Sequence, residues 1–368
     1  MSATNPLVQL GALGQSPWYD FITRELLATG ELRALISGDG LLGMTSNPTI
    51  FEKAIAGSTD YDDDIRHLAA EGHGAEEIFE GLAIADVRAA CDTFQPVYER
   101  THGVDGLVSL EVSPALAHDG EATEAAARRL WTAVARPNLM IKIPGTLEGL
   151  GAIERCIADG INVNVTLLFA VARHEAVMEA YLKGLERRLA AGQSIGGIAS
   201  VASFFVSRVD TKVDPLLATA GRADLRGTAA IANACLAYAA FERVFRGPRW
   251  DALAARGARV QRPLWASTST KDPALPDVYY VEALVAPQTV NTLPPETFAA
   301  YRDHGNPAVR LGPDAAAAAE SRLRELAGAG IDLDAATREL EAEGVQKFAA
   351  SFQSLLGGID AKAGALAG

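Results

Sequence analysis

The run NLMIKIPGT at residues 138–146 places one lysine, Lys142, inside an apolar segment typical of a short buried strand. Lysine is rarely fully buried unless its charge is paired. Burial favours the neutral amine, and a neutral amine can attack a carbonyl carbon to form a Schiff base. The alternative is a lysine whose side chain carries its charge to solvent at the strand end. This run alone leaves both interpretations open.

Other predicted strands also carry polar residues on one face. Residues two apart in a strand share a face. Within residues 161–167, one parity is wholly apolar, whereas the other holds Asn162, Asn164 and Thr166. Comparable polar residues near the ends of other strands, or just beyond them, are Asn47, Glu111, Lys142, Ser203 and Arg208. Strands of a parallel sheet are usually apolar on both faces, so these residues must line a polar interior site or bond one another.

These residue types suit Schiff-base chemistry on a sugar phosphate. Glu111, one strand before Lys142, is a candidate for proton transfer. Thr166, one strand after it, is a candidate to hold a water between its hydroxyl and Glu111. Asp20 is the second carboxylate, which would take a proton from a substrate hydroxyl during C–C cleavage. The remaining candidates are amides for sugar hydroxyls and cations for a phosphate: Asn47, Asn164, Arg208 and Lys271.

Each of these residues also has a purely structural interpretation. Asn47 precedes Pro48 and could be a turn residue or a helix N-cap. Glu111 could be a buried acid paired with the nearest base. Arg208 and Asp210 could form a surface ion pair of little energetic weight. A structural account of the whole set would need several coincident buried polar networks. We find no cluster of His, Cys and Asp that requires a metal.

Alternating strands and helices position these residues. Alternation of this kind predicts βαβ units and a parallel sheet. The predicted strands are near Gln15–Asp20, 41–47, 107–112, 139–143, 161–169, 198–205, 263–269 and 279–285. The predicted helices are 21–36, 61–71, 75–100, 123–135, 147–159, 170–191, 226–245, 315–326 and 334–353. Eight strands favour a closed (β/α)8 TIM barrel, whose active site lies at the C-terminal mouth. The alternative is an open doubly wound sheet, which usually shows a glycine-rich phosphate loop; we find none.

We expect one domain, residues 1–368, with additional helices. Residues 295–368 are predicted to be a helical C-terminal extension packed on the barrel. A helix start is plausible at Asp332-Leu333-Asp334. No Pro/Gly/Ser-rich linker isolates this tail, which argues against a separate domain.

Composition excludes several classes of protein. The chain has 368 residues, 49% hydrophobic and 21% charged, with a formal net charge of −13 and no basic run. We therefore expect no nucleic acid partner, because phosphate contacts need clustered basic residues. Three scattered cysteines show no disulfide or zinc spacing. We also expect no signal peptide or membrane span, which leaves the cytoplasm. Separately, we expect a monomer or homodimer.

The motifs resemble the transaldolase family, in its longer bacterial form, over nearly the whole chain. The similar blocks are residues 43–51 (GMTSNPTIF), 139–149 (LMIKIPGTLEG), 161–169 (INVNVTLLF), 203–208 (SFFVSR), 265–271 (WASTSTK) and 289–292 (TVNT). The resemblance implies a class I aldolase-type barrel without a cofactor. Such an enzyme is a transferase in the pentose phosphate pathway. It moves a dihydroxyacetone unit from sedoheptulose 7-phosphate or fructose 6-phosphate to glyceraldehyde 3-phosphate or erythrose 4-phosphate.

Matching by motif implies a role for each candidate residue. Lys142 would form the Schiff base, Glu111 with Thr166 would activate water, and Asp20 would act as acid and base at the cleaved bond. The residues implied in substrate binding are Asn47, Asn164, Ser203, Phe205, Arg208 and Lys271. Three positions depart from the pattern of many members: Ser46 replaces Thr, Asp20 has an unusual sequence context, and Lys271 stands where shorter members carry Arg.

Two other functions compete with this interpretation. A fructose-6-phosphate aldolase would release dihydroxyacetone to water. The resemblance suggests that those relatives carry Gln in place of Glu111 and Tyr in place of Phe205, so both observed residues favour transfer. A non-catalytic binding barrel would not need Lys142, Glu111 and Thr166 on three neighbouring strands.

Overall fold

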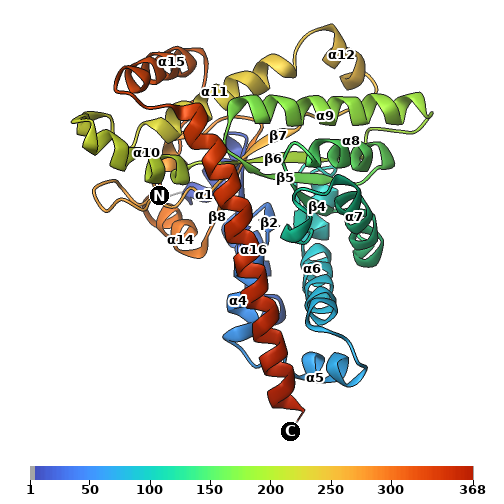
Figure 1. Cartoon of the computed structure of the whole chain (residues 1–368). Coiled ribbons are helices and arrows are strands. Elements are labelled where there is room, and N and C mark those ends of the chain that lie inside the picture. The colour runs from blue at the N-terminus through green and yellow to red at the C-terminus, as the bar shows by residue number, and fades with distance from the viewer. Residues whose placement is uncertain (1–4, 368) are drawn as a thin grey trace.

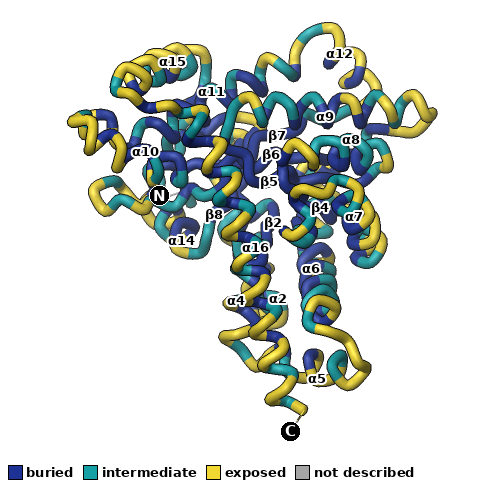
Figure 2. Tube along the Cα trace, viewed as in Figure 1, coloured by how far each residue is buried: buried dark blue, intermediate teal, exposed yellow. Residues whose placement is uncertain are grey.

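A computed structural model describes residues 5–367. Eight parallel strands close into a barrel in sequence order, β1 to β8, so the predicted TIM barrel is confirmed. Helices surround the strands, which are buried at the centre (Figures 1 and 2). The strands are β1 (Gln15–Asp20), β2 (Gly43–Thr45), β3 (Leu107–Glu111), β4 (Leu139–Pro144), β5 (Val163–Leu168), β6 (Ser200–Phe205), β7 (Arg262–Ala266) and β8 (Thr289–Leu293).

The helices agree largely with the predicted ones. Up to β5 they are α1 (Pro6–Ala12), α2 (Arg24–Ala28), α3 (Glu31–Gly38), α4 (Pro48–Ala56), α5 (Asp62–Ala70), α6 (Ala75–Arg100), η1 (Pro114–Leu116), α7 (Gly120–Val134) and α8 (Gly149–Asp159). After β5 they are α9 (Val171–Ala190), α10 (Ser207–Thr219), η2 (Ala223–Leu225), α11 (Ala229–Val244), α12 (Pro248–Ala254), α13 (Tyr279–Ala283), α14 (Pro295–His304), α15 (Pro313–Gly328) and α16 (Leu333–Leu366).

Two predicted elements were wrong. Residues 279–285 are not the eighth strand but contain α13, since the buried residues Tyr280, Val281 and Leu284 have helical spacing. The eighth strand is β8, whose Thr and Asn residues resemble a loop in the sequence. They are buried on both faces of the strand, Thr289 and Asn291 on one and Thr292 on the other. The predicted helix 21–36 is two helices, because Gly30 between them adopts a left-handed φ of +85°.

The long helix α16 crosses the C-terminal mouth of the barrel. It contacts α4, α5 and α6 as well as α10, η1 and β5, and its long ribbon runs from near α15 to the C-terminus (Figure 1). The predicted start is confirmed, because the Asp332 side chain caps the helix by accepting a hydrogen bond from the Ala335 N–H at 2.8 Å. That residues 295–368 form an extension of one domain stays a prediction, and the boundaries at 1 and 368 lie outside the described residues.

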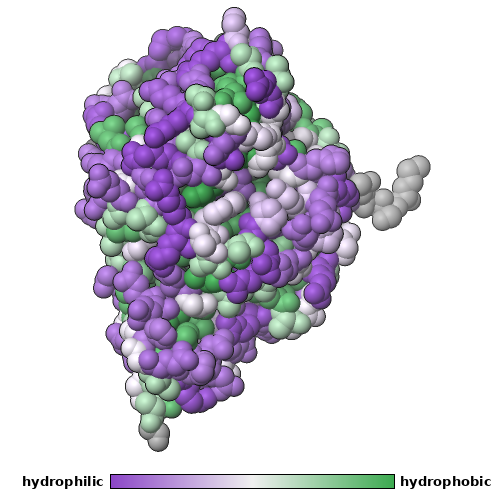
Figure 3. Space-filling view, turned by 90° about the vertical axis from the view of Figure 1, so that its right-hand side faces the viewer, coloured by the Kyte–Doolittle hydropathy of each residue, from purple (hydrophilic) through white to green (hydrophobic). Residues whose placement is uncertain are grey.

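The surface is mostly hydrophilic. Seen from the side, hydrophilic side chains predominate, with hydrophobic ones scattered between them (Figure 3). Within residues 5–367, none of the helices combines the length and apolarity needed to cross a membrane.

Packing between β1 and β2 leaves no room for a side chain at Gly43. Gly43 pairs with the fully buried Trp18, and a Cβ added there would fall inside contact distance of the Trp18 indole. We expect Gly43→Ala to lower the free energy of unfolding by about 1–3 kcal/mol through overpacking. Gly38→Ala is the matched control, because open space surrounds Gly38. Urea denaturation of both variants tests this; equal stabilities would show that the barrel relaxes around the extra methyl group.

Candidate active site

Lys142 is buried inside the mouth of the barrel and does not carry its charge to solvent. It is 5% exposed, and its Nζ lies 3.0 Å from the Glu111 Oε2. The same Nζ donates a hydrogen bond to the Ser46 carbonyl oxygen at 3.2 Å. Strand register pairs Lys142 with Glu111 on β3 and with Asn164 on β5. The structural alternative, in which this lysine extends to solvent, is therefore wrong.

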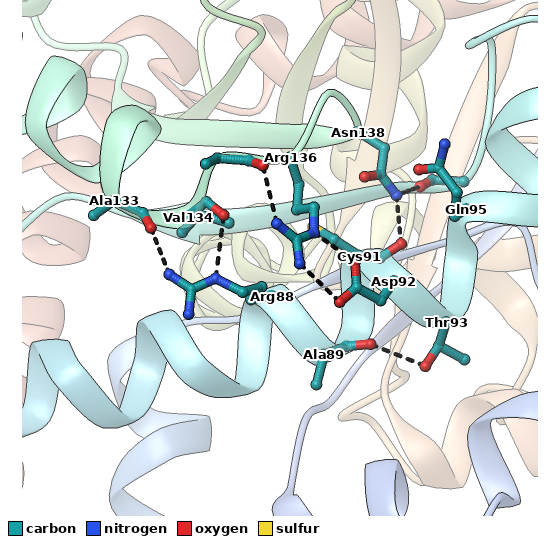
Figure 4. A network of polar contacts seen from close by, with 12 residues as sticks. Arg88, Ala89, Cys91, Asp92, Thr93, Gln95, Ala133, Val134, Arg136 and Asn138 are labelled. Atoms are coloured by element: carbon teal, nitrogen blue, oxygen red, sulfur yellow. Dashed lines mark hydrogen bonds and ion pairs between the residues drawn. The ribbon is translucent and has the colours of Figure 1, made fainter.

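The strand that carries Lys142 is fixed at its start by a polar network (Figure 4). Asn138, fully buried just before β4, donates hydrogen bonds to the carbonyl oxygens of Cys91 at 2.9 Å and Gly106 at 2.8 Å. Arg88 of α6 donates to the carbonyl of Ala133 at 2.6 Å near the end of α7. These bonds tie α6 and α7 to the start of β4. Hydrogen bonds to backbone carbonyls near the start of β4 thereby fix how far along the barrel Lys142 lies.

Glu111 and Asp20 are two carboxyl groups beside the lysine with altered acidity. Burial raises the pKa of Glu111, and the charge of Lys142 opposes this effect. Burial also raises the pKa of Asp20, opposed by Lys142 and by a hydrogen bond from the Thr45 hydroxyl to Asp20 Oδ1 at 2.7 Å. A carboxyl group with a raised pKa can both take up and return a proton near neutral pH. The pair therefore has the properties of acid–base groups.

Thr166 lies next to this group at a distortion of β5. The register between β5 and β6 shifts between Val165 and Leu168, and Leu167 adopts a left-handed φ of +61°. That conformation costs a non-glycine residue about 1–2 kcal/mol, and such bulges redirect side chains near active sites. The Thr166 hydroxyl is buried and has no hydrogen-bond partner among the described residues. A buried unpaired hydroxyl is available to bind a ligand or a water.

Asn164 links three strands. Its side-chain N–H donates to the Ser109 hydroxyl at 3.0 Å, and the Ser203 hydroxyl donates to its carbonyl oxygen at 2.7 Å. Asn164 is fully buried and does not line the cavity described below, whereas Ser203 does. Asn164 thus holds Ser203 in place.

A cavity of about 390 Å³ brings most of the candidate residues together. The candidates that line it are Asp20, Asn47, Lys142, Thr166, Ser203, Phe205 and Arg208. Glu111 is not part of the cavity lining, but it forms an ion pair with Lys142, which is. Asn47 was predicted as a site residue and, alternatively, as a helix N-cap. It is in both positions, since it lines the cavity and also caps α4 by accepting a hydrogen bond from the Ile50 N–H at 3.0 Å.

The cavity has a cationic side at the start of α10. Arg208 lies with its Cζ 5.0 Å from the centroid of the Phe205 ring. Burial lowers the pKa of Arg208, and the charges of Asp20 and Glu343 oppose this effect. Ser267 and Ser269, in the loop after β7, line the same cavity. Asp210 forms no surface ion pair here; it is buried and accepts hydrogen bonds from Ala230 and Tyr280.

Lys271 does not join this group, whereas several residues not selected from the sequence do, among them Lys53 and Phe348. Lys271 is exposed and is not among the residues lining the cavity. Lys53 of α4 and Phe348 of α16 do line it. Lys53 lies four residues after Thr49, which also lines the cavity, so the two share one face of α4. Phe348 could not have been suspected, since nothing in the sequence says that the tail crosses the mouth. Within residues 5–367 no three His, Cys, Asp or Glu side chains are grouped to hold a metal ion.

A parallel barrel with a lysine–carboxylate pair at its C-terminal mouth is the arrangement of a Schiff-base-forming barrel enzyme. The chain belongs to the transaldolase/fructose-6-phosphate aldolase family, which it matches over residues 17–359. It is 54% identical to a transaldolase of Acidothermus cellulolyticus, over 97% of this chain and 96% of that protein. It is 51% identical to a transaldolase of Parafrankia, over 99% and 100%, and 50% identical to one of Mycolicibacterium smegmatis, over 96% of each.

The hydrogen bond from Thr45 to Asp20 generates a pH prediction. The Thr45 hydroxyl stabilises the ionised Asp20 carboxylate, so its removal raises the pKa of Asp20. If Asp20 must be ionised to act as a base, the acidic limb of the pH profile of kcat/KM shifts to higher pH in Thr45→Val. Thr45→Ser, which keeps the hydroxyl, should retain the wild-type limb. An unshifted limb in Thr45→Val would mean that Asp20 is not the titrating group.

Proposed function

We propose that this protein is a transaldolase. It would transfer a dihydroxyacetone unit from sedoheptulose 7-phosphate or fructose 6-phosphate to glyceraldehyde 3-phosphate or erythrose 4-phosphate, in the pentose phosphate pathway. The observation that carries the proposal is the buried Lys142–Glu111 pair at 3.0 Å, with Asp20 in the same cavity. Family membership and the names of the relatives support the same reaction.

In the first half-reaction, Lys142 supplies the nucleophile. Glu111, whose pKa is raised by burial, accepts a proton from the ammonium. The neutral amine then attacks the C2 carbonyl of the ketose phosphate. Glu111 returns a proton as the resulting hydroxyl leaves as water, giving the iminium. We propose that this water lies between Glu111 and the unpaired hydroxyl of Thr166. The same two residues would activate a water to hydrolyse the iminium that holds the product.

C–C cleavage requires a base on the far side of the substrate. Asp20 takes the proton from the C4 hydroxyl, the C3–C4 bond breaks, and its electrons pass into the iminium to form an enamine. The aldose phosphate leaves. An incoming aldehyde is attacked by the enamine carbon, and its oxygen receives the proton from Asp20. Burial raises the pKa of Asp20, which makes its carboxylate a stronger base than a solvent-exposed one.

The remaining cavity residues would bind the sugar. We propose that Asn47 and Ser203 contact hydroxyl groups, with Asn164 acting through Ser203. Phe205 presents an apolar wall beside Arg208, and Arg208 would bind the phosphate. No cofactor is required by this chemistry. We also propose that the protein acts in the cytoplasm, as a monomer or homodimer and without a nucleic acid partner.

The dependence of turnover on an aldehyde acceptor tests this function. With fructose 6-phosphate as donor, we expect glyceraldehyde 3-phosphate to form much faster when erythrose 4-phosphate is present, with little free dihydroxyacetone. A coupled assay measures the first compound and proton NMR the second. Lys142→Arg keeps the positive charge but cannot form the Schiff base, and should be inactive. Turnover that ignores the acceptor would identify a fructose-6-phosphate aldolase instead. Binding without any turnover would indicate a non-catalytic barrel.

The phosphate site yields a second test, which compares two cations. Arg208→Ala should raise KM for fructose 6-phosphate about tenfold or more, because a charge-assisted hydrogen bond contributes roughly 1.5–3 kcal/mol. Lys271→Ala is the matched variant and, since Lys271 is exposed outside the cavity lining, should change KM by less than about twofold. Steady-state kinetics decide between them. A larger rise in KM for Lys271→Ala would show that Lys271 binds the phosphate after all.

A further inference from the structure

The C-terminal helix α16 delivers one aromatic ring to the active cavity. Its buried residues recur three or four positions apart and include Gly344, Phe348, Phe352 and Leu355. Such spacing places them on one face of the helix. Among the described residues of α16, Phe348 alone lines the cavity. Phe352, one turn further on, lines a neighbouring cavity and packs edge-on against Phe79, with ring centroids 5.5 Å apart.

The ring of Phe348 lies near two cations of the site. Its centroid is 5.7 Å from the Lys142 Nζ and 5.9 Å from the Arg208 Cζ. The side chain is 7% exposed, so the ring occupies space at the mouth that solvent would otherwise fill. Both distances lie at the outer limit of cation–π attraction, about 6 Å. The main physical effect of the ring is therefore to exclude water from the vicinity of the amine.

The helix is held against the mouth by bonds at both ends and in the middle. Lys212 of α10 forms ion pairs of 2.7 Å with both Glu339 and Glu343. Further along, the Thr49 hydroxyl bonds to Ser351 at 2.9 Å, and Lys362 pairs with Asp62 at 2.7 Å. These contacts fix the position of Phe348 from both sides.

Close packing also sets the height of the helix above β5. A Cβ at Gly344 would lie only 3.0 Å from the side chain of Leu167, next to Thr166. Gly344 thus lets α16 approach the strand end. Phe348 follows four residues later on the same face, which places its ring directly at the cavity.

We propose that Phe348 is a specificity-determining residue that keeps the covalent intermediate for the aldehyde acceptor by excluding water. The proposal rests on the transaldolase function above. In transfer, the enamine carbon forms a new bond to the aldehyde carbon, and the aldehyde oxygen takes the proton from Asp20. In the competing leak, the enamine carbon takes a proton instead. Water then adds to the iminium carbon, the C–N bond breaks, and free dihydroxyacetone and the Lys142 amine are released.

The measured quantity is the rate of dihydroxyacetone release divided by the rate of transfer to erythrose 4-phosphate. Phe348→Ala opens the space above Lys142 to water, and should raise this ratio by roughly tenfold. Phe348→Leu keeps part of the apolar volume and should raise it by roughly two- to fivefold. Proton NMR of the reaction with fructose 6-phosphate gives both rates in one sample.

Leu355→Ala is the matched control. It removes a buried side chain from the same face of the helix without touching the cavity or its neighbour, so it should lower the midpoint of thermal unfolding and leave the ratio unchanged. An unchanged ratio in Phe348→Ala, or an equal rise in Leu355→Ala, overturns the proposal. If Phe348→Ala does not fold, Phe348→Leu decides by the same criterion. A wild-type enzyme that shows no acceptor-dependent transfer would instead refute the proposed function itself.

Discussion

The burial of one ammonium next to one carboxylate is the constraint on which the site depends. Neither charge is tolerable alone at this depth, since removing one partner of a buried pair typically costs about 3–5 kcal/mol. Lys142 and Glu111 are 6% and 4% exposed in their side chains and only 3.0 Å apart. The backbone must therefore hold β3 and β4 in a fixed register. The network around Asn138 and the strand pairing of Glu111 with Lys142 provide that register.

The same constraint explains why the barrel interior is polar. Asp20 brings a second carboxyl group close to the pair, and its charge further raises the pKa of Glu111. Hydrogen bonds from Thr45 to Asp20 and from Ser203 to Asn164 satisfy polar groups that burial would otherwise leave unpaired. Left-handed conformations at Leu167 and at the cavity residue Ser267 store backbone strain at this site. This strain lowers stability locally, at the residues that surround the proposed chemistry.

Much of the barrel was predictable because its signals are local. Buried strands with one polar face appear in the sequence itself, and β1 and α6 have the predicted bounds. The eighth strand was misplaced because a short apolar run suits helix or strand equally, while β8 is polar for reasons that only the closed barrel reveals. The parity argument found Lys142, Glu111 and Thr166. It could not find Phe348, because the path of α16 depends on contacts between residues some 130 to 300 positions apart, such as Lys212–Glu339 and Lys362–Asp62. Lys271 was chosen as a cation for the phosphate, and its side chain lies outside the cavity lining.

The central claim is that Lys142, rather than another lysine near the mouth, forms the covalent intermediate. Borohydride reduction in the presence of fructose 6-phosphate, followed by peptide mass mapping, tests this most directly. We predict a reduced sugar adduct on the peptide containing Lys142, with Lys53 and Lys271 unmodified. An adduct on a different lysine, or reduction that leaves every peptide unmodified, would contradict the account.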